Sequence, residues 1–97
     1  MNKFNEAQIH SELKNLDGWK YNSNALEKSF VFKNFKEALS AMVRISFEAE
    51  AMNHHPDWTN VYNKLKIRLN THDAGGITEK DFALAKKIDD LIPEHRS

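Results

Sequence analysis

The 97-residue sequence contains no cysteine, only three glycines and two prolines, and no excess of either charge. Without cysteine, the chain has neither a disulfide bond nor a thiolate metal site. Basic and acidic residues number 14 each, so the basic excess of a dedicated nucleic-acid binder is missing. We expect a single domain over residues 1–97 with a modest core, for which self-association would add useful apolar burial.

Long hydrophobic runs are missing as well. The longest mostly apolar segment, Ala38 to Phe47, is interrupted by Ser40, Arg44 and Ser46. The N-terminal segment has no continuous apolar run, so it resembles neither a signal peptide nor a membrane anchor. The expectation is a soluble, cytoplasmic protein that does not associate with membranes.

The first third of the chain predicts a helix and a hairpin. Asn5 can cap a helix that begins at Glu6, and apolar residues follow at helical spacing until Asp17-Gly18 ends the pattern. The hairpin consists of a strand, a turn and a second strand, at residues 19–21, 22–24 and 26–32. Strands joined by so short a turn pair antiparallel.

Residues 35–52 predict a long amphipathic helix capped by Asn34. Apolar residues recur along it at spacings of three or four, namely Phe35, Leu39, Met42, Ile45, Ala49 and Met52. Val43 and Phe47 widen this apolar face beyond what one small sheet covers. The additional stripe can face the core or meet another subunit, and both alternatives stay open.

The second hairpin and the last helix complete the chain. The strands are expected at residues 58–62 and 65–69, where apolar and polar residues alternate. Gly75-Gly76 permits a tight bend, and Thr78 begins a helix with Asp81 as the acidic partner of a capping box. The order α-β-β-α-β-β-α predicts an α+β fold, with helices packed on one face of a four-stranded antiparallel sheet.

Three histidines lie where two of these elements end. His54 and His55 follow the long helix, which must stop before Pro56, and His72 follows the last strand. Histidine gives and takes protons near neutrality because its unperturbed pKa is about 6.5, so a pair of histidines can serve as acid and base. Glu50 lies one helical turn before His54, close enough to orient it.

Structural readings of these residues compete with the functional one. His10 and His95 are typical of capping or surface groups. Trp58, a possible stacking platform, and Tyr62 are more often core residues, and Asp81 alone is stabilised simply by the helix dipole. The residues by themselves leave both readings open.

Zinc is a further alternative, because three histidines can bind a catalytic ion. The sequence has no His-x-x-x-His pair, and adjacent side chains such as His54 and His55 seldom converge on one ion without help from the loop. The pattern therefore favours acid–base chemistry without a metal.

Residues 50–64, EAMNHHPDWTNVYNK, followed by Thr71-His72-Asp73 and residues 76–81, GITEKD, resemble the signature of the pterin-4a-carbinolamine dehydratases. That signature is E-x-x-x-H-H-P-x-W, a hairpin, T-H and G-[IL]-[ST]-x-x-D. Length and element order extend the resemblance over nearly the whole chain. Lys80 stands where some members carry arginine, which keeps the positive charge but loses the bidentate fork.

The resemblance implies a hydro-lyase. Aromatic amino acid hydroxylases leave their tetrahydropterin cofactor as a 4a-hydroxy adduct, and this family removes water from it to give quinonoid dihydropterin, which a reductase recycles. The hydroxyl on C4a is protonated and N5 loses a proton, so neither a hydride nor a covalent intermediate is required. The family needs no metal and no organic cofactor.

The resemblance also implies roles for seven residues. These are catalysis for His54, His72 and His55, substrate binding for His55, Pro56 and Trp58, and support of the imidazoles by the carboxylates of Glu50 and Asp81. His54 and His72 form the implied acid/base pair, and His55 orients the pterin. Which of the pair protonates the hydroxyl stays open, because members act on both C4a stereoisomers.

The implied assembly is a homodimer or homotetramer, with the long helix and a sheet edge as contacts. An animal relative also serves as a dimerisation cofactor for a homeodomain transcription factor, so a protein-binding coactivator is a second hypothesis. A pterin enzyme of molybdenum-cofactor metabolism is a third. The complete histidine set favours the enzyme, since an adaptor would not need it.

Overall fold

The computed structural model describes residues 2–93 as an α+β fold with the predicted order of elements. The elements are α1 (Glu6–Leu13), β1 (Lys20–Asn22), β2 (Ala25–Val31), α2 (Phe35–Met52), β3 (Asp57–Val61), β4 (Lys64–Leu69), a short 3-10 helix η1 (His72–Ala74) and α3 (Glu79–Leu91). Of these, only η1 is not among the predicted elements. His95, expected to be a surface group, lies outside the described residues.

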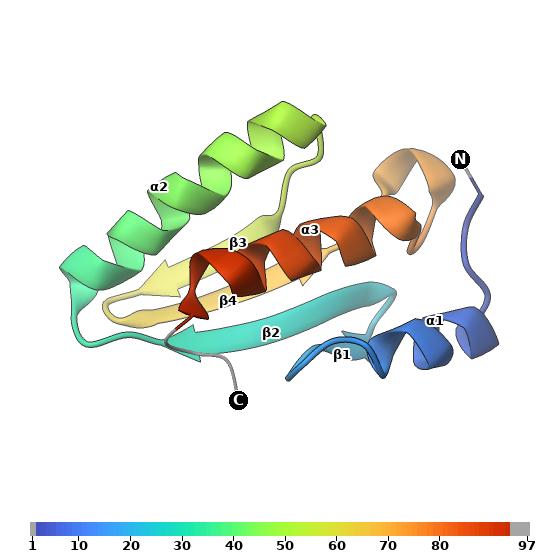
Figure 1. Cartoon of the computed structure of the whole chain (residues 1–97), viewed down its shortest axis with the longest axis horizontal. Helices are drawn as coiled ribbons and strands as arrows, with labels where there is room; N and C mark the ends of the chain where they lie inside the picture. The colour runs from blue at the N-terminus through green and yellow to red at the C-terminus, as the bar shows by residue number, and fades with distance from the viewer. Residues whose placement is uncertain (1, 94–97) are drawn as a thin grey trace.

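The four strands form one antiparallel sheet in the order β1-β2-β4-β3. Helices α2 and α3 lie across the same face of this sheet, and α1 lies beside β1 at its edge (Figure 1). Because the register places Leu26 opposite Leu69 and Phe30 opposite Leu65, the apolar side chains of the two central strands point to the helices together. This confirms the predicted sheet with its helices on one side.

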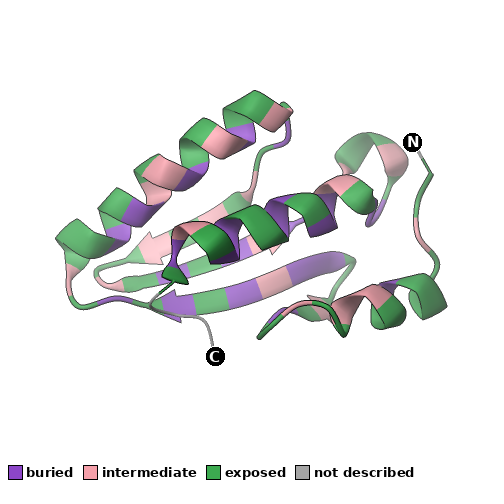
Figure 2. Ribbon diagram, in the orientation of Figure 1, coloured by how far each residue is buried: buried purple, intermediate pink, exposed green. Residues whose placement is uncertain are grey.

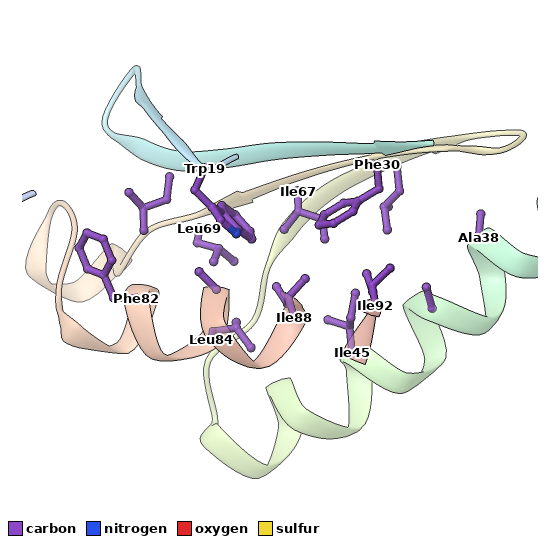
Figure 3. Close-up of a cluster of buried hydrophobic side chains, with 14 of the residues drawn as sticks. Trp19, Phe30, Ala38, Ile45, Ile67, Leu69, Phe82, Leu84, Ile88 and Ile92 are labelled. Atoms are coloured by element: carbon purple, nitrogen blue, oxygen red, sulfur yellow. The ribbon is translucent and has the colours of Figure 1, made fainter. Parts of the chain in front are cut away.

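The core lies between the sheet and these helices. Figure 3 shows Phe30 and Ile67 of the sheet facing Ile88 of α3 and Ile45 of α2. On β2 and β4, buried and less buried residues alternate (Figure 2). Each fully buried large apolar side chain stabilises the fold by about 1.5–3 kcal/mol, so this layer holds the two hairpins against the helices.

The buried face of α2 differs from the predicted one. Its buried residues are Ala38, Ala41, Ile45 and Ala49. Phe35 and Leu39, expected in the core stripe, are 47% and 46% exposed. The small alanine side chains allow α2 to pack closely, and this turns the larger residues outward. Apolar spacing alone did not identify this, because it counts alanine and phenylalanine alike.

The first helix is shorter than predicted. It begins at Glu6 after the Asn5 cap, as expected, but ends at Leu13 instead of reaching Asp17-Gly18. The chain continues in turns, in which the Leu16 N–H donates to the Leu13 carbonyl at 3.1 Å. Leu16 still packs against the core, which explains why it fits the apolar spacing without being helical.

A buried polar cluster joins β2 to α3 on the side of β1. The Lys28 Nζ atom lies 2.9 Å from Oδ1 of Asp89 and donates to the Asp17 carbonyl at 2.6 Å. The Trp19 indole N–H donates to the same Asp89 carboxylate at 3.1 Å. The three polar side chains thus satisfy one another inside the apolar layer, as buried charges require.

Candidate functional site

The turn that follows α2 sets the directions of the two adjacent histidines. Asn53 caps the helix in the left-handed conformation, with φ 50°, which asparagine tolerates better than most residues. The His54 N–H still donates to the Ala49 carbonyl at 3.0 Å, which ties the turn to the last helical residues. As a result, the His54 side chain is buried and the His55 side chain is exposed.

His54 is held by a buried carboxylate. Its Nε2 atom lies 2.6 Å from Oδ1 of Asp81, whose side chain is completely buried. The other oxygen of Asp81 accepts the Thr78 N–H and the Thr71 hydroxyl, both at 2.9 Å. Because carboxylate oxygens only accept hydrogen bonds, the ring nitrogen must be the donor in this contact. The hydrogen-bond network therefore assigns a proton to Nε2 of His54.

The second ring nitrogen of His54 is therefore the free acceptor of the neutral imidazole. Within residues 2–93, no buried side-chain nitrogen or oxygen lacks a hydrogen-bond partner. The hydrogen bond of the His54 ring is made at Nε2, so Nδ1 keeps at least some access to solvent. An imidazole nitrogen of this kind is a suitable proton acceptor, because the carboxylate on the other side of the ring would stabilise the resulting imidazolium.

A chain of hydroxyl groups extends this network to the segment that carries His72. The Thr71 hydroxyl donates to Asp81, so the Thr78 hydroxyl, 2.7 Å away, must donate to Thr71. Thr78 in turn accepts the N–H of Lys80 at 3.2 Å. The same capping box that starts α3 thus links the residue before His72 to the carboxylate behind His54.

The turn after α2 and the segment that carries His72 border a cavity of about 320 Å³. Its lining consists of Asn53, His54, His55, Asn70, Thr71, His72, Asp73 and Lys80. The volume lies at the small end of the range for small-molecule sites. The structure therefore brings the three predicted histidines together, although His72 is 17 residues beyond His55 in the sequence.

Glu50 contacts a different histidine from the one predicted. Its Oε1 atom lies 2.6 Å from Nε2 of His55, not from His54. The left-handed turn at Asn53 breaks the helical spacing, so the residue five positions on, not four, returns to Glu50. Both side chains are exposed, by 78% for Glu50 and 56% for His55, so the pair orients the imidazole without stabilising the fold appreciably.

The family model of the pterin 4 alpha carbinolamine dehydratases matches residues 2–91. The chain belongs to this family.

Known proteins support the same assignment over nearly the whole chain. A protein of Christiangramia forsetii named "Putative pterin-4-alpha-carbinolamine dehydratase" is 55% identical over 92 residues, which is 95% of each chain. A protein of the same name from Sulfurisphaera tokodaii is 48% identical over 95% of this chain and 99% of its own. The crystal structure of a transcriptional coactivator/pterin dehydratase from Brucella melitensis superposes with a TM-score of 0.90 at 36% identity, covering 93% of this chain and 98% of that chain.

Two residues of the dehydratase motif lie beside the cavity lining instead of in it. Pro56 leads from His55 into β3 and is partly buried. Trp58 lies opposite Ile67 in the sheet and packs against the core, partly buried. Trp58 thus packs against the core with part of its side chain, and contact of either residue with substrate stays a prediction.

The cavity also contains residues that the sequence reasoning did not single out as site residues. Asn53, Asn70, Asp73 and Lys80 supply amide, carboxylate and ammonium groups to its wall. Asn53 was recognisable as the residue between a helix and a histidine pair. Asn70 was hidden, because its position depends on where β4 ends relative to the turn after α2.

The part of the chain that the structure describes contains neither a group of side chains that could bind a metal ion nor a helix that could span a membrane. In residues 2–93, no group of three or more histidine, aspartate or glutamate side chains is arranged to hold a metal ion. In the same range, no helix combines the length and the apolar character needed to cross a membrane.

Proposed function

We propose that this chain is a hydro-lyase that dehydrates 4a-hydroxytetrahydropterin to quinonoid dihydropterin by histidine acid/base catalysis. The observation that carries the proposal is the convergence of three histidines on one cavity, with His54 fixed by the buried carboxylate of Asp81. Membership of the dehydratase family supports the reaction class. Acid/base groups at the correct positions are sufficient for this reaction, because the substrate itself supplies the electrons that expel water.

The reaction needs one proton delivered and one removed. The hydroxyl on C4a leaves as water when a group such as the His72 imidazolium protonates it, and the lone pair of N5 forms the new double bond to C4a. N5 then loses its proton to an acceptor, for which His54 Nδ1 is suited because Asp81 stabilises the imidazolium that results. Each such group contributes about 10²–10⁴-fold to the rate. The opposite C4a stereoisomer would use the same two histidines with their roles exchanged.

The remaining site residues bind and orient the flat substrate. His55, held by Glu50 at 2.6 Å, projects from the turn after α2 and is suited to contact the pterin ring. Pro56 and Trp58 support the wall from which it projects. In the cell, the product would return to a reductase that regenerates the tetrahydropterin of aromatic amino acid hydroxylases, and we place this cycle in the cytoplasm.

We also propose that the chain is a homo-oligomer that buries the outer face of α2. Four apolar residues spaced four apart lie exposed on that face, which are Phe35, Leu39, Val43 and Phe47. Such a row is typical of a contact surface, since single exposed apolar residues are common but continuous stripes are not. A second copy that presents the same stripe would cover it.

The test is stopped-flow dehydration of freshly generated 4a-hydroxytetrahydropterin. We expect His72→Ala to lower turnover by about 10²–10⁴-fold, the contribution of a general acid or base. His10→Ala should leave turnover unchanged, because His10 is exposed on α1, where it contacts Tyr21 and does not line the cavity. Equal small effects from the two variants would refute the assignment. Loss of activity on adding a chelator would instead indicate a metal enzyme, and pterin binding without turnover would indicate an adaptor.

A further inference from the structure

The segment that carries His72 has little regular structure of its own. His72 and Asp73 are exposed, and η1 is only three residues long. The hydrogen bonds within the segment close it into a turn: the Thr71 N–H donates to the Gly76 carbonyl at 2.8 Å, and the Gly75 N–H donates to the carbonyls of Thr71 and His72 at 3.0 Å. These bonds fix the shape of the turn, and the Thr71 hydroxyl ties its first residue to Asp81, the partner of His54. They do not by themselves hold the rest of the turn against the neighbouring elements.

A residue from the first hairpin reaches this turn. The side-chain Nδ2 of Asn24 donates to the Gly75 carbonyl at 3.1 Å, across 51 residues of sequence. The Gly75 N–H meanwhile donates to the His72 carbonyl. Gly75 is therefore held at its carbonyl by Asn24 and at its N–H by the residue that carries the imidazole.

The contact between the two turns is close. A Cβ atom at position 76 would lie 2.6 Å from the Lys3 side chain and 3.3 Å from Oδ1 of Asn24, so the glycine there allows the loop to pass against both residues. The Asn70 amide approaches the Asn24 carbonyl at 3.5 Å, at the limit of hydrogen-bond length. Asn70 itself lines the cavity, so the β1–β2 turn reaches the cavity wall at Asn70 and the loop that carries His72 at Gly75.

Asn24 is not the residue that its own turn would favour most. Its φ is 62° and that of Ser23 is 50°, so both central residues of the hairpin are left-handed. Glycine adopts this conformation at the lowest cost and is preferred in such turns. An asparagine here is therefore unfavourable locally compared with glycine, whereas its amide makes a contact that glycine lacks.

We propose that Asn24 is a positioning residue for His72, acting through Gly75 to hold the imidazole in the place in the cavity that proton transfer to the substrate needs. The inference rests on the proposed function of His72, but not on the identity of the hydroxylase or of the pterin side chain. Asn24 itself does not line the cavity, so it acts on turnover through the loop and not through substrate binding.

The test compares the same substitution at the two left-handed positions of one turn. Asn24→Gly removes the amide and suits the backbone. Ser23→Gly is the matched control, because within residues 2–93 the Ser23 side chain hydrogen-bonds only to the neighbouring Asn22. The experiment would measure backbone amide hydrogen exchange of residues 71–76 by NMR, together with kcat and KM for dehydration. For Asn24→Gly we expect Gly75 and its neighbours to exchange about three- to tenfold faster, the effect of one lost hydrogen bond.

In the same variant, kcat should fall several-fold with KM nearly unchanged, whereas Ser23→Gly should alter neither exchange nor kcat. Asn24→Asp provides a second test, because it keeps the size of the side chain but places a carboxylate against the Gly75 carbonyl. It should loosen the loop more than Asn24→Gly does.

Equal loop exchange in Asn24→Gly and Ser23→Gly would overturn the inference, and so would faster exchange without a change in kcat. Hydrogen exchange requires no substrate. A wild-type protein without dehydratase activity would therefore refute the proposed function, while the exchange data would still decide whether Asn24 holds the loop.

Discussion

Nε2 of His54 lies 2.6 Å from Oδ1 of Asp81, and the side chains of this pair are only 9% and 0% exposed. Asp81 is also the N3 residue of the α3 capping box, where it accepts the Thr78 N–H. One carboxylate thus starts a helix and fixes an imidazole. The stability of α3 and the proton position on His54 are therefore coupled, and substitutions at this carboxylate affect both.

Replacing Asp81 separates these two roles. Asp81→Asn keeps an acceptor oxygen for the cap but removes the charge that stabilises a protonated His54. We expect turnover to fall by about 10²-fold or more, near the lower end of a general base contribution, and the free energy of unfolding to fall by about 1–3 kcal/mol. Stopped-flow kinetics and urea unfolding measure the two effects. Asp73→Asn, at an exposed carboxylate of the same cavity, is the control, and an equal loss in both variants would contradict the prediction.

The Thr71 hydroxyl should matter through Asp81. Thr71→Val keeps the shape of the side chain but leaves Asp81 without one donor and the Thr78 hydroxyl without its acceptor. We expect a loss of about 1–3 kcal/mol in unfolding free energy, as for other unsatisfied buried groups, and lower turnover. Thr71→Ser should restore both. Thr59→Val, on the exposed side of β3, serves as the comparison, and the prediction fails if it has the same effect as Thr71→Val.

Acid should weaken the sheet through Glu27. The pKa of Glu27 is lowered from its ordinary value of 4.5, first by a hydrogen bond from Asn22 and then by Lys66 and Arg68, while partial burial opposes the shift. A carboxyl whose folded pKa is lowered stabilises the fold above its unfolded pKa, and this contribution is lost as the pH falls through the folded pKa. Urea unfolding from neutral to acidic pH should show a steeper loss in the wild type than in Glu27→Gln. Parallel curves would show that Glu27 is not involved.

The α2 stripe offers a test of assembly. Phe47 is 73% exposed, so Phe47→Glu should leave the fold intact. A charge within an apolar contact is costly to bury, so the variant should dissociate into monomers in sedimentation or light-scattering measurements. Lys87→Glu, on the exposed side of α3, changes the charge by more than Phe47→Glu does but lies outside the stripe, so this variant should not dissociate. A wild-type protein that is already monomeric would refute the proposed contact.

Much of the fold was predictable because local signals and tertiary packing agree. Asn34 and Pro56 delimit α2, and its predicted bounds, residues 35–52, are those of the structure. The alternation in β4 and the capping box of α3 likewise depend on neighbouring residues only. Where a signal is complete within a few residues, the sequence specifies the element without reference to the rest of the chain.

The predictions that were wrong involve contacts that local spacing does not determine. The outward side of α2 depends on which residues pack closely, and alanines do so better than Phe35 or Leu39. Glu50 contacts His55 because one left-handed residue, Asn53, intervenes.

The convergence of His72 with His54 follows from strand order, which places the end of β4 near the turn after α2. The roles of the site residues stay predictions until the variants are measured.

The two tryptophans lie in different environments and can serve as separate optical probes. Trp19 is enclosed in the buried polar cluster that joins β2 to α3, with its indole N–H on Asp89, whereas Trp58 is partly buried two residues beyond the Pro56 that ends the histidine turn. Indole emission depends on local polarity, so the emission of Trp58 should change when a ligand binds beside it, and that of Trp19 should change when α3 separates from β2. Ligand binding and global unfolding can thus be followed in one unlabelled sample, with single Trp→Phe variants to assign each signal.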